Sequence, residues 1–157
     1  MMTEDKQNQL KEAFPRLFRS DPNSPSSFDS FGIECGNGWF DIIFKLCTDI
    51  EAELTKNEVP EEDWPHVRQV KEKFGRLRFY ISQSELVKGE TVSNITEFRP
   101  IPDMAELQIL IQEAEAKSLK ICEDCGEKGT FRNDGWLSVR CDACEQLHLE
   151  KRKEFLK

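Results

Sequence analysis

The stretch CEDCGEKGTFRNDGWLSVRCDAC, residues 122–144, contains two Cys-x2-Cys pairs separated by 15 residues. Each pair places two thiolates on one tight turn, and two such turns can close a tetrahedron around one metal ion. Four thiolates leave no coordination position for water, so we expect one structural zinc ion per chain rather than a catalytic one. The predicted ligands are Cys122, Cys125, Cys141 and Cys144.

The residues between and after the two pairs predict how this segment folds. Gly126 lets the backbone turn after the first pair, and the NDG cluster at 133–135 suits a hairpin loop. Asp142 is expected to cap a following helix, with Glu145 at capping-box spacing. Knuckle, hairpin and helix form the layout of a treble-clef finger. A zinc ribbon, with three strands and no helix, is the alternative.

Three other side chains of this segment have two interpretations each. Phe131 and Trp136 are expected to shield the metal cluster rather than to stack on nucleic-acid bases. His148 follows Cys144 by four residues and could replace a cysteine ligand, but four cysteines already complete the tetrahedron.

The composition is that of a chain with one core and a highly charged surface. Of 157 residues, 38% are apolar and 33% charged, and 11 Phe and three Trp suffice for a sizeable core. No apolar run approaches membrane-spanning length, and the N-terminus lacks the apolar region of a secretory signal. We therefore expect a cytoplasmic protein whose cysteines are ligands or free thiols. A six-cysteine disulfide framework is the disfavoured alternative.

The net charge of −8 lies entirely in the first 117 residues, which carry 14 basic and 22 acidic side chains. The remaining residues carry eight of each sign. A protein that tracks phosphates usually has a basic surface, so any nucleic-acid role must depend on a local patch.

The N-terminal half predicts two helices and a short extended segment. Thr3 is a plausible N-cap of a helix that ends near Phe14, before Pro15. Residues 20–31 contain two Pro and five Ser and are expected to form a loop, followed by an extended segment at 31–35. Apolar residues at spacings of three and four predict a largely buried helix from Gly38 to about Lys56.

A hairpin is predicted from residues 67–73 and 76–82. The second strand alternates strictly between apolar and polar side chains, and Gly75 lies where the turn needs a positive φ. The apolar side chains of that strand are Leu77, Phe79 and Ile81, and they are expected to pack on the helix that begins at Gly38.

The rest of the chain completes a predicted α+β fold, a small antiparallel sheet packed with helices. Residues 91–95 could form an edge strand, and a helix capped by Asp103 should run through about Ser118. We expect a core domain over residues 1–118 and a zinc-binding module over residues 119–157.

One face of the predicted hairpin is the best candidate for binding an anion or a partner. Its side chains are Lys71, Lys73, Arg76, Arg78 and Tyr80. Cations of this kind bind phosphate, nucleotides or acidic protein surfaces. The alternative is an ordinary solvated face whose cations pair with the abundant Glu and Asp.

The sequence contains no recognisable catalytic motif. It has no Walker A, GxGxxG, GxSxG or HExxH pattern, and only two His. Cys35 and Cys47 are expected to be small core residues rather than a reactive pair.

Three stretches together resemble a known group of proteins. They are CGNGWFDIIFKLCTDIE at 35–51, VKEKFGRLRFYIS at 70–82 and the cysteine segment at 122–144. The combination resembles small zinc-binding proteins of bacteriophages, prophages and bacterial genomes. The resemblance implies an intracellular accessory protein, and it assigns no catalytic residue.

Three functions follow in order of preference. The first is a non-enzymatic, zinc-stabilised protein that binds another protein. The second is a nucleic-acid-binding zinc protein, and the third and weakest is a binder of a small anionic ligand.

Overall fold

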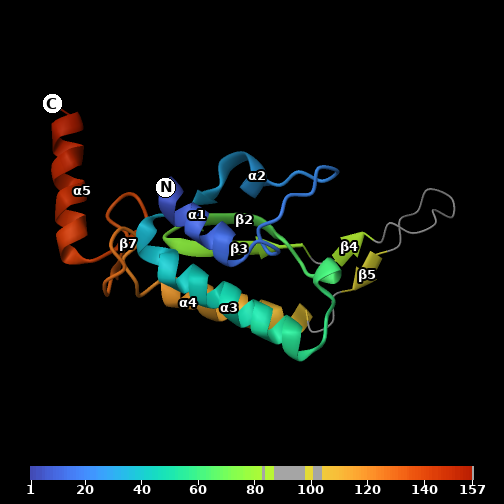
Figure 1. Cartoon of the computed structure of the whole chain (residues 1–157). Helices are drawn as coiled ribbons and strands as arrows, with labels where there is room; N and C mark the ends of the chain where they lie inside the picture. Colours follow the sequence, from blue (N-terminus) through green and yellow to red (C-terminus); the bar gives the residue numbers. More distant parts are fainter. Residues whose placement is uncertain (83, 87–97, 101–103, 157) are drawn as a thin grey trace.

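The computed structural model describes residues 1–82, 84–86, 98–100 and 104–156 and shows a mixed arrangement of helices and small sheets. Figure 1 shows the elements in chain order. The helices are α1 (Glu4–Ala13), α2 (Ser27–Phe31), α3 (Phe40–Lys56), α4 (Met104–Ser118) and α5 (Asp142–Phe155), with short 3₁₀ helices η1 (Asn37–Trp39) and η2 (Glu61–Asp63). The strands are β1 (Ile33–Glu34), β2 (Val67–Lys73), β3 (Arg76–Ile81), β4 (Ser84–Leu86), β5 (Phe98–Pro100), β6 (Thr130–Arg132) and β7 (Ser138–Arg140). The predicted α+β class is confirmed.

The main sheet has the order β1-β2-β3 and is mixed rather than wholly antiparallel. β1 runs parallel to β2, with Ile33 opposite Val70 and Glu34 opposite Lys71. The reason is the helix between them: α3 carries the chain back along the sheet, so β2 starts from the same end as β1. The sequence predicted the extended segment but not its parallel pairing.

The predicted β2–β3 hairpin is confirmed. Phe74 and Gly75 form its turn with φ values of 55° and 79°, the two left-handed residues that a tight type I′ turn requires. The apolar side chains of β3 are buried and its polar side chains lie on the opposite face.

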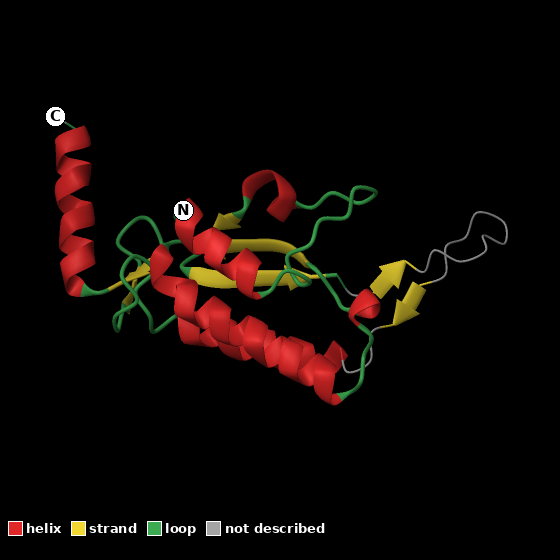
Figure 2. Ribbon diagram, in the orientation of Figure 1, coloured by secondary structure: helices red, strands yellow, loops and turns green. Residues whose placement is uncertain are grey.

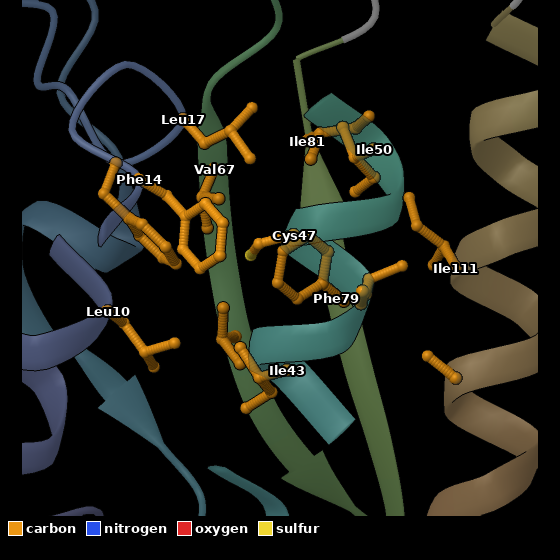
Figure 3. Packing of buried hydrophobic residues seen from close by; sticks show 14 of the residues in the cluster. Leu10, Phe14, Leu17, Ile43, Cys47, Ile50, Val67, Phe79, Ile81 and Ile111 are labelled. Carbon is orange, nitrogen blue, oxygen red and sulfur yellow. The ribbon is translucent and has the colours of Figure 1, made fainter. Parts of the chain in front are cut away.

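The core lies on the apolar face of this sheet, where α1, α3 and α4 pack. Figure 3 shows Leu10 and Phe14 at the α1 side, Ile43 and Cys47 of α3 in the centre, and strand and α4 side chains pointing toward them. α3 and α4 lie side by side along the sheet (Figure 2). This arrangement leaves the other face of β2 and β3 free of the three long core helices.

α4 also covers the free edge of β3. The Leu77 amide donates to Ser118 Oγ at 3.0 Å, and the Phe79 amide donates to Glu115 Oε2 at 3.0 Å. Unpaired edge amides are a template for further strands, so these two side chains close the edge to such pairing.

One prediction for the N-terminal half is wrong. Residues 27–31 form the short helix α2 instead of continuing the predicted loop. The cause is a capping box: Ser26 Oγ accepts from the Asp29 amide at 3.2 Å, and Asp29 Oδ2 accepts from the Ser26 amide at 2.7 Å. Phe28 then adds a buried ring to the core.

Of the remaining predictions, some are confirmed and two concern residues that the structure does not describe. The helix over residues 4–13 and the helices α3 and α4 confirm the predicted segments. The proposed strand at 91–95 and the proposed cap Asp103 lie outside the described residues. The described strands β4 and β5 pair antiparallel and form a separate two-stranded sheet.

Candidate metal centre and cationic sheet face

The four predicted ligands come together. The Sγ atoms of Cys122, Cys125, Cys141 and Cys144 all lie within 4.8 Å of one another, and those of Cys125 and Cys141 are 3.6 Å apart. Zn–S bonds of about 2.3 Å in a tetrahedron require S–S separations of about 3.8 Å. The cluster therefore fits a metal ion such as zinc.

The first pair sits on a knuckle that backbone hydrogen bonds hold. The Cys122 amide donates to the Glu127 carbonyl at 2.7 Å, and the Gly126 amide donates to the Cys122 carbonyl at 2.9 Å. Gly126 has a φ of 84°, which only glycine adopts easily. This geometry turns the chain so that both thiols face the same point.

The second pair lies at the start of α5. Cys141 is the N-cap, and its Sγ accepts from the Cys144 amide at 3.4 Å. That hydrogen bond lowers the pKa of Cys141 to about 7, which favours the thiolate that a metal needs. The predicted cap, Asp142, is wrong by one residue, because the thiol takes the capping position. The Asp142 carboxylate instead accepts a hydrogen bond from Arg132 Nη2 at 2.8 Å.

Knuckle, β6–β7 hairpin and α5 follow in the order of the treble-clef alternative, and the helix separates this layout from a three-stranded ribbon. β6 and β7 pair antiparallel, as predicted. His148 lies on α5, outside the four-cysteine cluster.

The predicted shielding role of the two aromatic residues is wrong for Trp136, whose side chain is 77% exposed. Phe131 is 42% exposed and packs against the β2–β3 turn instead: a Cβ on Gly75 would lie 2.8 Å from Phe131 Cε2. The two hairpins therefore touch at their ends. Nothing in either hairpin's own sequence indicates this contact.

An open hollow lies where the two hairpins meet. Its volume is about 360 Å³, and Glu72, Lys73, Phe74, Trp136 and Leu137 line it. Glu72 is turned toward the backbone, because its Oε1 accepts from the Gly75 amide at 2.6 Å.

The knuckle that carries Cys122 and Cys125 is also hydrogen-bonded to the residues that precede α3. The Gly38 amide donates to the Glu123 carbonyl at 2.7 Å, the Gly36 amide donates to Glu123 Oε2 at 2.9 Å, and Trp39 Nε1 donates to the Ile121 carbonyl at 2.9 Å. Burial raises the pKa of Glu123. The sequence predicted only that a helix begins at Gly38, and it did not indicate that Gly36 and Gly38 bind the knuckle. The division into residues 1–118 and 119–157 stays a prediction.

The predicted cationic residues form one continuous surface. Across the hairpin, Lys71 lies opposite Arg78, Lys73 opposite Arg76, and Gln69 opposite Tyr80. Lys73 is exposed, and the two arginines are half-buried with Nε atoms that have no hydrogen-bond partner. We name the surface made by Lys71, Lys73, Arg76 and Arg78 the cationic face.

The alternative interpretation, cations paired with nearby carboxylates, does not describe this face. Within the part of the chain that the structure describes, none of its four cations makes an ion pair or a hydrogen bond. Glu34 is beside Lys71 in the sheet, yet its Oε1 has no partner. Like charges directly opposite each other destabilise a sheet. The predicted role of this face in binding an anion or a partner stays a prediction.

Cys35 and Cys47 are both buried, as predicted, and burial raises the pKa of each thiol. Both belong to the hydrophobic core. A thiol held protonated in an apolar setting is a poor nucleophile.

Comparison with protein-family models, with curated proteins and with solved structures gave no match for this chain. The resemblance to phage and prophage proteins therefore stays a prediction. Across the described ranges, no helix combines the length and the apolar character that crossing a membrane requires.

Proposed function

We propose that this protein is a non-enzymatic, zinc-stabilised accessory protein that acts by binding an anionic partner through the cationic face. The observation that carries the proposal is the two opposed cation pairs without carboxylate partners. In a chain with a net charge of −8, carboxylates are plentiful, so four unneutralised cations on one sheet face form a distinct local charge.

The geometry of the cysteines supports a structural role for zinc. Four thiolates complete the coordination of the ion and leave no position for a substrate or a reactive water. The ion would hold the knuckle and α5 together, and thereby the β6–β7 hairpin between them. We expect the protein to act in the cytoplasm, where a reducing environment keeps cysteine ligands free.

The shape of the cationic face favours an extended partner over a small anion. Its two cation pairs follow each other along the strands at about 7 Å, twice the rise per residue. A partner with repeated negative charges can engage both pairs at once. An acidic protein segment and a nucleic-acid strand both meet this requirement, whereas a lone small anion does not.

The test is binding of anionic polymers measured by fluorescence anisotropy. The panel contains a polyglutamate peptide, heparin and single-stranded oligonucleotides at about 0.1 M salt. The double variant Arg76→Glu/Arg78→Glu should bind at least about tenfold more weakly than the wild type. Absence of binding to every polymer would refute the proposal.

A matched control has the same charge change elsewhere. Lys56 and Lys117 are exposed residues in the last turns of α3 and α4. These two helices pack on the apolar face of the sheet, opposite the cationic face. The double variant Lys56→Glu/Lys117→Glu should keep wild-type affinity. Equal losses in the two double variants would show that net charge, and not the cationic face, controls binding.

A further inference from the structure

Exposed aromatic side chains lie at both ends of the cationic face. Tyr80 is 46% exposed and follows Arg78 on the same side of β3. At the other end, Phe74 is 64% exposed and Trp136 is 77% exposed, and both line the hollow that Lys73 also borders. The Lys73 ammonium lies 5.5 Å from the centre of the Phe74 ring.

Such exposure is unusual where a core is available nearby. Large aromatic side chains normally gain free energy from burial, and groups of exposed apolar residues mark interaction sites. The other two tryptophans, Trp39 and Trp64, are buried. Trp136 is therefore the exposed tryptophan of the chain, and it lines the same hollow as the unpaired Lys73, whereas the exposed rings of Phe31 and Phe155 lie on α2 and α5.

We propose that the cationic face binds a single strand of nucleic acid, DNA or RNA. The phosphates would lie on Lys71, Lys73, Arg76 and Arg78. Bases would stack on Tyr80 at one end and on Phe74 and Trp136 at the other. This inference rests on the proposed function and names the partner of that same face.

A single strand fits this surface better than a duplex does. Proteins that bind single strands combine cations along the backbone with aromatic rings on which bases stack. The base faces of a duplex are covered by neighbouring base pairs, so a duplex could not stack bases on Tyr80, Phe74 or Trp136. The residues from Arg76 to Tyr80 span about 14 Å along β3, and Trp136 extends the surface beyond the turn.

An acidic protein segment would use only half of this chemistry. Carboxylates would neutralise the four cations, but Asp and Glu side chains carry no aromatic ring, whereas every nucleotide brings a base that can stack. The hollow beside Trp136 has apolar walls with Lys73 and Glu72 at its border. One oxygen of Glu72 is already engaged by the Gly75 amide, so Lys73 is the charge available to a phosphate whose base enters the hollow. The aromatic residues thus favour nucleic acid over a protein partner.

The net charge of −8 does not prevent this binding. At physiological ionic strength the Debye length is about 8 Å, so a strand on the cationic face senses mainly the nearest charges. The acidic remainder of the surface would weaken additional contacts and confine the strand to this face.

The zinc module has a direct part in this proposal. Trp136 lies on the connection between β6 and β7, and Phe131 of β6 packs against Gly75 at the end of the other hairpin. Zinc therefore positions one of the stacking rings beside the cations. Removal of the metal should separate the aromatic end from the cationic end of the surface.

The experiment titrates the full-length zinc-loaded protein with oligo(dT), oligo(U), a DNA duplex and polyglutamate. Because Trp39 and Trp64 are buried, quenching of the accessible tryptophan emission reports on Trp136. We expect both single strands to bind and to quench this emission. Neutralising four phosphates gives a slope of about −3 in log affinity against log salt concentration.

Variants separate stacking from charge. Trp136→Ala should weaken binding of the single strands by roughly 5- to 150-fold, the range for loss of one stacked base. Arg76→Glu/Arg78→Glu should weaken binding by at least about tenfold and flatten the salt dependence of what remains. Phe155→Ala removes another exposed aromatic ring, on α5, and should bind as the wild type does. Since all the replaced side chains are exposed or half-buried, unchanged circular dichroism checks the fold of each variant.

The outcomes distinguish the two proposals. Tight binding of polyglutamate that depends on Arg76 and Arg78, without quenching by either oligonucleotide, would overturn this inference and leave the proposed function standing. Equal affinity for duplex and single strand in both the wild type and Trp136→Ala would also overturn it. Failure to bind any of the polymers, heparin included, would overturn both.

Discussion

The two hairpins that meet at Gly75 and Phe131 have the same simple connection but are held in place by different means. β2–β3 lies over the core, and its inward side chains Leu77 and Phe79 are buried. β6–β7 buries little more than Ser138 and Val139, and its flanking cysteines converge on one point. Apolar burial stabilises the first hairpin, and a metal site is expected to stabilise the second.

This difference explains what each hairpin can leave exposed. Since one face of β2–β3 supplies the stability, the other face can carry four cations that repel one another. Since a metal bound by the cysteines would hold β6–β7, the hairpin would not need its tryptophan for packing, and Trp136 is exposed. In both hairpins the expected source of stability is separate from the surface that we propose binds a partner.

Removal of the metal should have the largest effect and should break only one side of the comparison. Structural zinc contributes on the order of 10 kcal/mol to the folding of small zinc-finger peptides. Chelation or Cys125→Ser should therefore unfold the chain from about residue 119 onward. Hydrogen exchange measured by mass spectrometry should show lost protection there and retained protection in β2–β3.

Cys47→Ser is the control, because it alters a buried thiol that is not a predicted ligand. It should leave one zinc per chain, whereas Cys125→Ser should lose the metal. An apo protein with unchanged near-UV circular dichroism and protease resistance would contradict the zinc assignment.

The opposite change removes the anchor of the core hairpin. Phe79 lies among the core side chains (Figure 3) and is 2% exposed, and Phe→Ala changes at buried sites cost about 3–5 kcal/mol. Phe79→Ala should therefore lower the free energy of unfolding of the whole core in a urea titration. Tyr80→Ala, one residue further on the exposed face, should lower it by less than about 1 kcal/mol. Similar losses for the two variants would show that β3 does not separate a buried from an exposed face.

Local patterns in the sequence were sufficient for the elements that depend on near neighbours. Strict alternation after Arg76 specified β3 and its two faces, and the Cys-x2-Cys spacing specified the metal cluster. Ser26 and Asp29 also have the spacing of a capping box, which forms in the structure. The surrounding Pro and Ser residues favoured the prediction of a loop, so the short helix α2 was not predicted.

Contacts between distant segments could not be predicted in the same way. The parallel pairing of β1 with β2 depends on where α3 returns the chain. The seat of the knuckle on Gly38 and the meeting of the two hairpins join residues that are more than 50 positions apart. No periodicity or spacing within one segment encodes such contacts. The sequence therefore did not show that Phe131 packs on the other hairpin while Trp136 stays exposed.

A substitution at Gly38 should sharpen the comparison by weakening the link between core and knuckle. A Cβ at this position would clash with the carbonyl oxygens of Cys122 and Glu123, and overpacking typically costs about 1–3 kcal/mol. Gly38→Ala should lower the thermal stability and weaken zinc retention against a chelator. Asn37→Ala, which removes only an exposed hydrogen bond from the Thr3 amide, should leave zinc retention unchanged. Unchanged zinc retention in Gly38→Ala would show that the knuckle does not depend on its seat.

The smallest expected effect has an unusual sign and tests why the core hairpin carries its cations. Arg78→Glu would place a carboxylate opposite Lys71, and replacing repulsion by attraction across a strand pair is worth roughly 0.2–1 kcal/mol. We therefore expect the free energy of unfolding to rise while affinity for anionic polymers falls.

The control Lys56→Glu makes the same change in net charge, from −8 to −10, at the C-terminal end of α3. It should be destabilising, because a cation is favoured at that end of a helix. If Arg78→Glu were the more destabilising of the two, the stem of Arg78 would be a packing element of the sheet. A gain in stability together with a loss of binding would show that the cationic face is kept at a cost to folding, which is the behaviour of a binding surface.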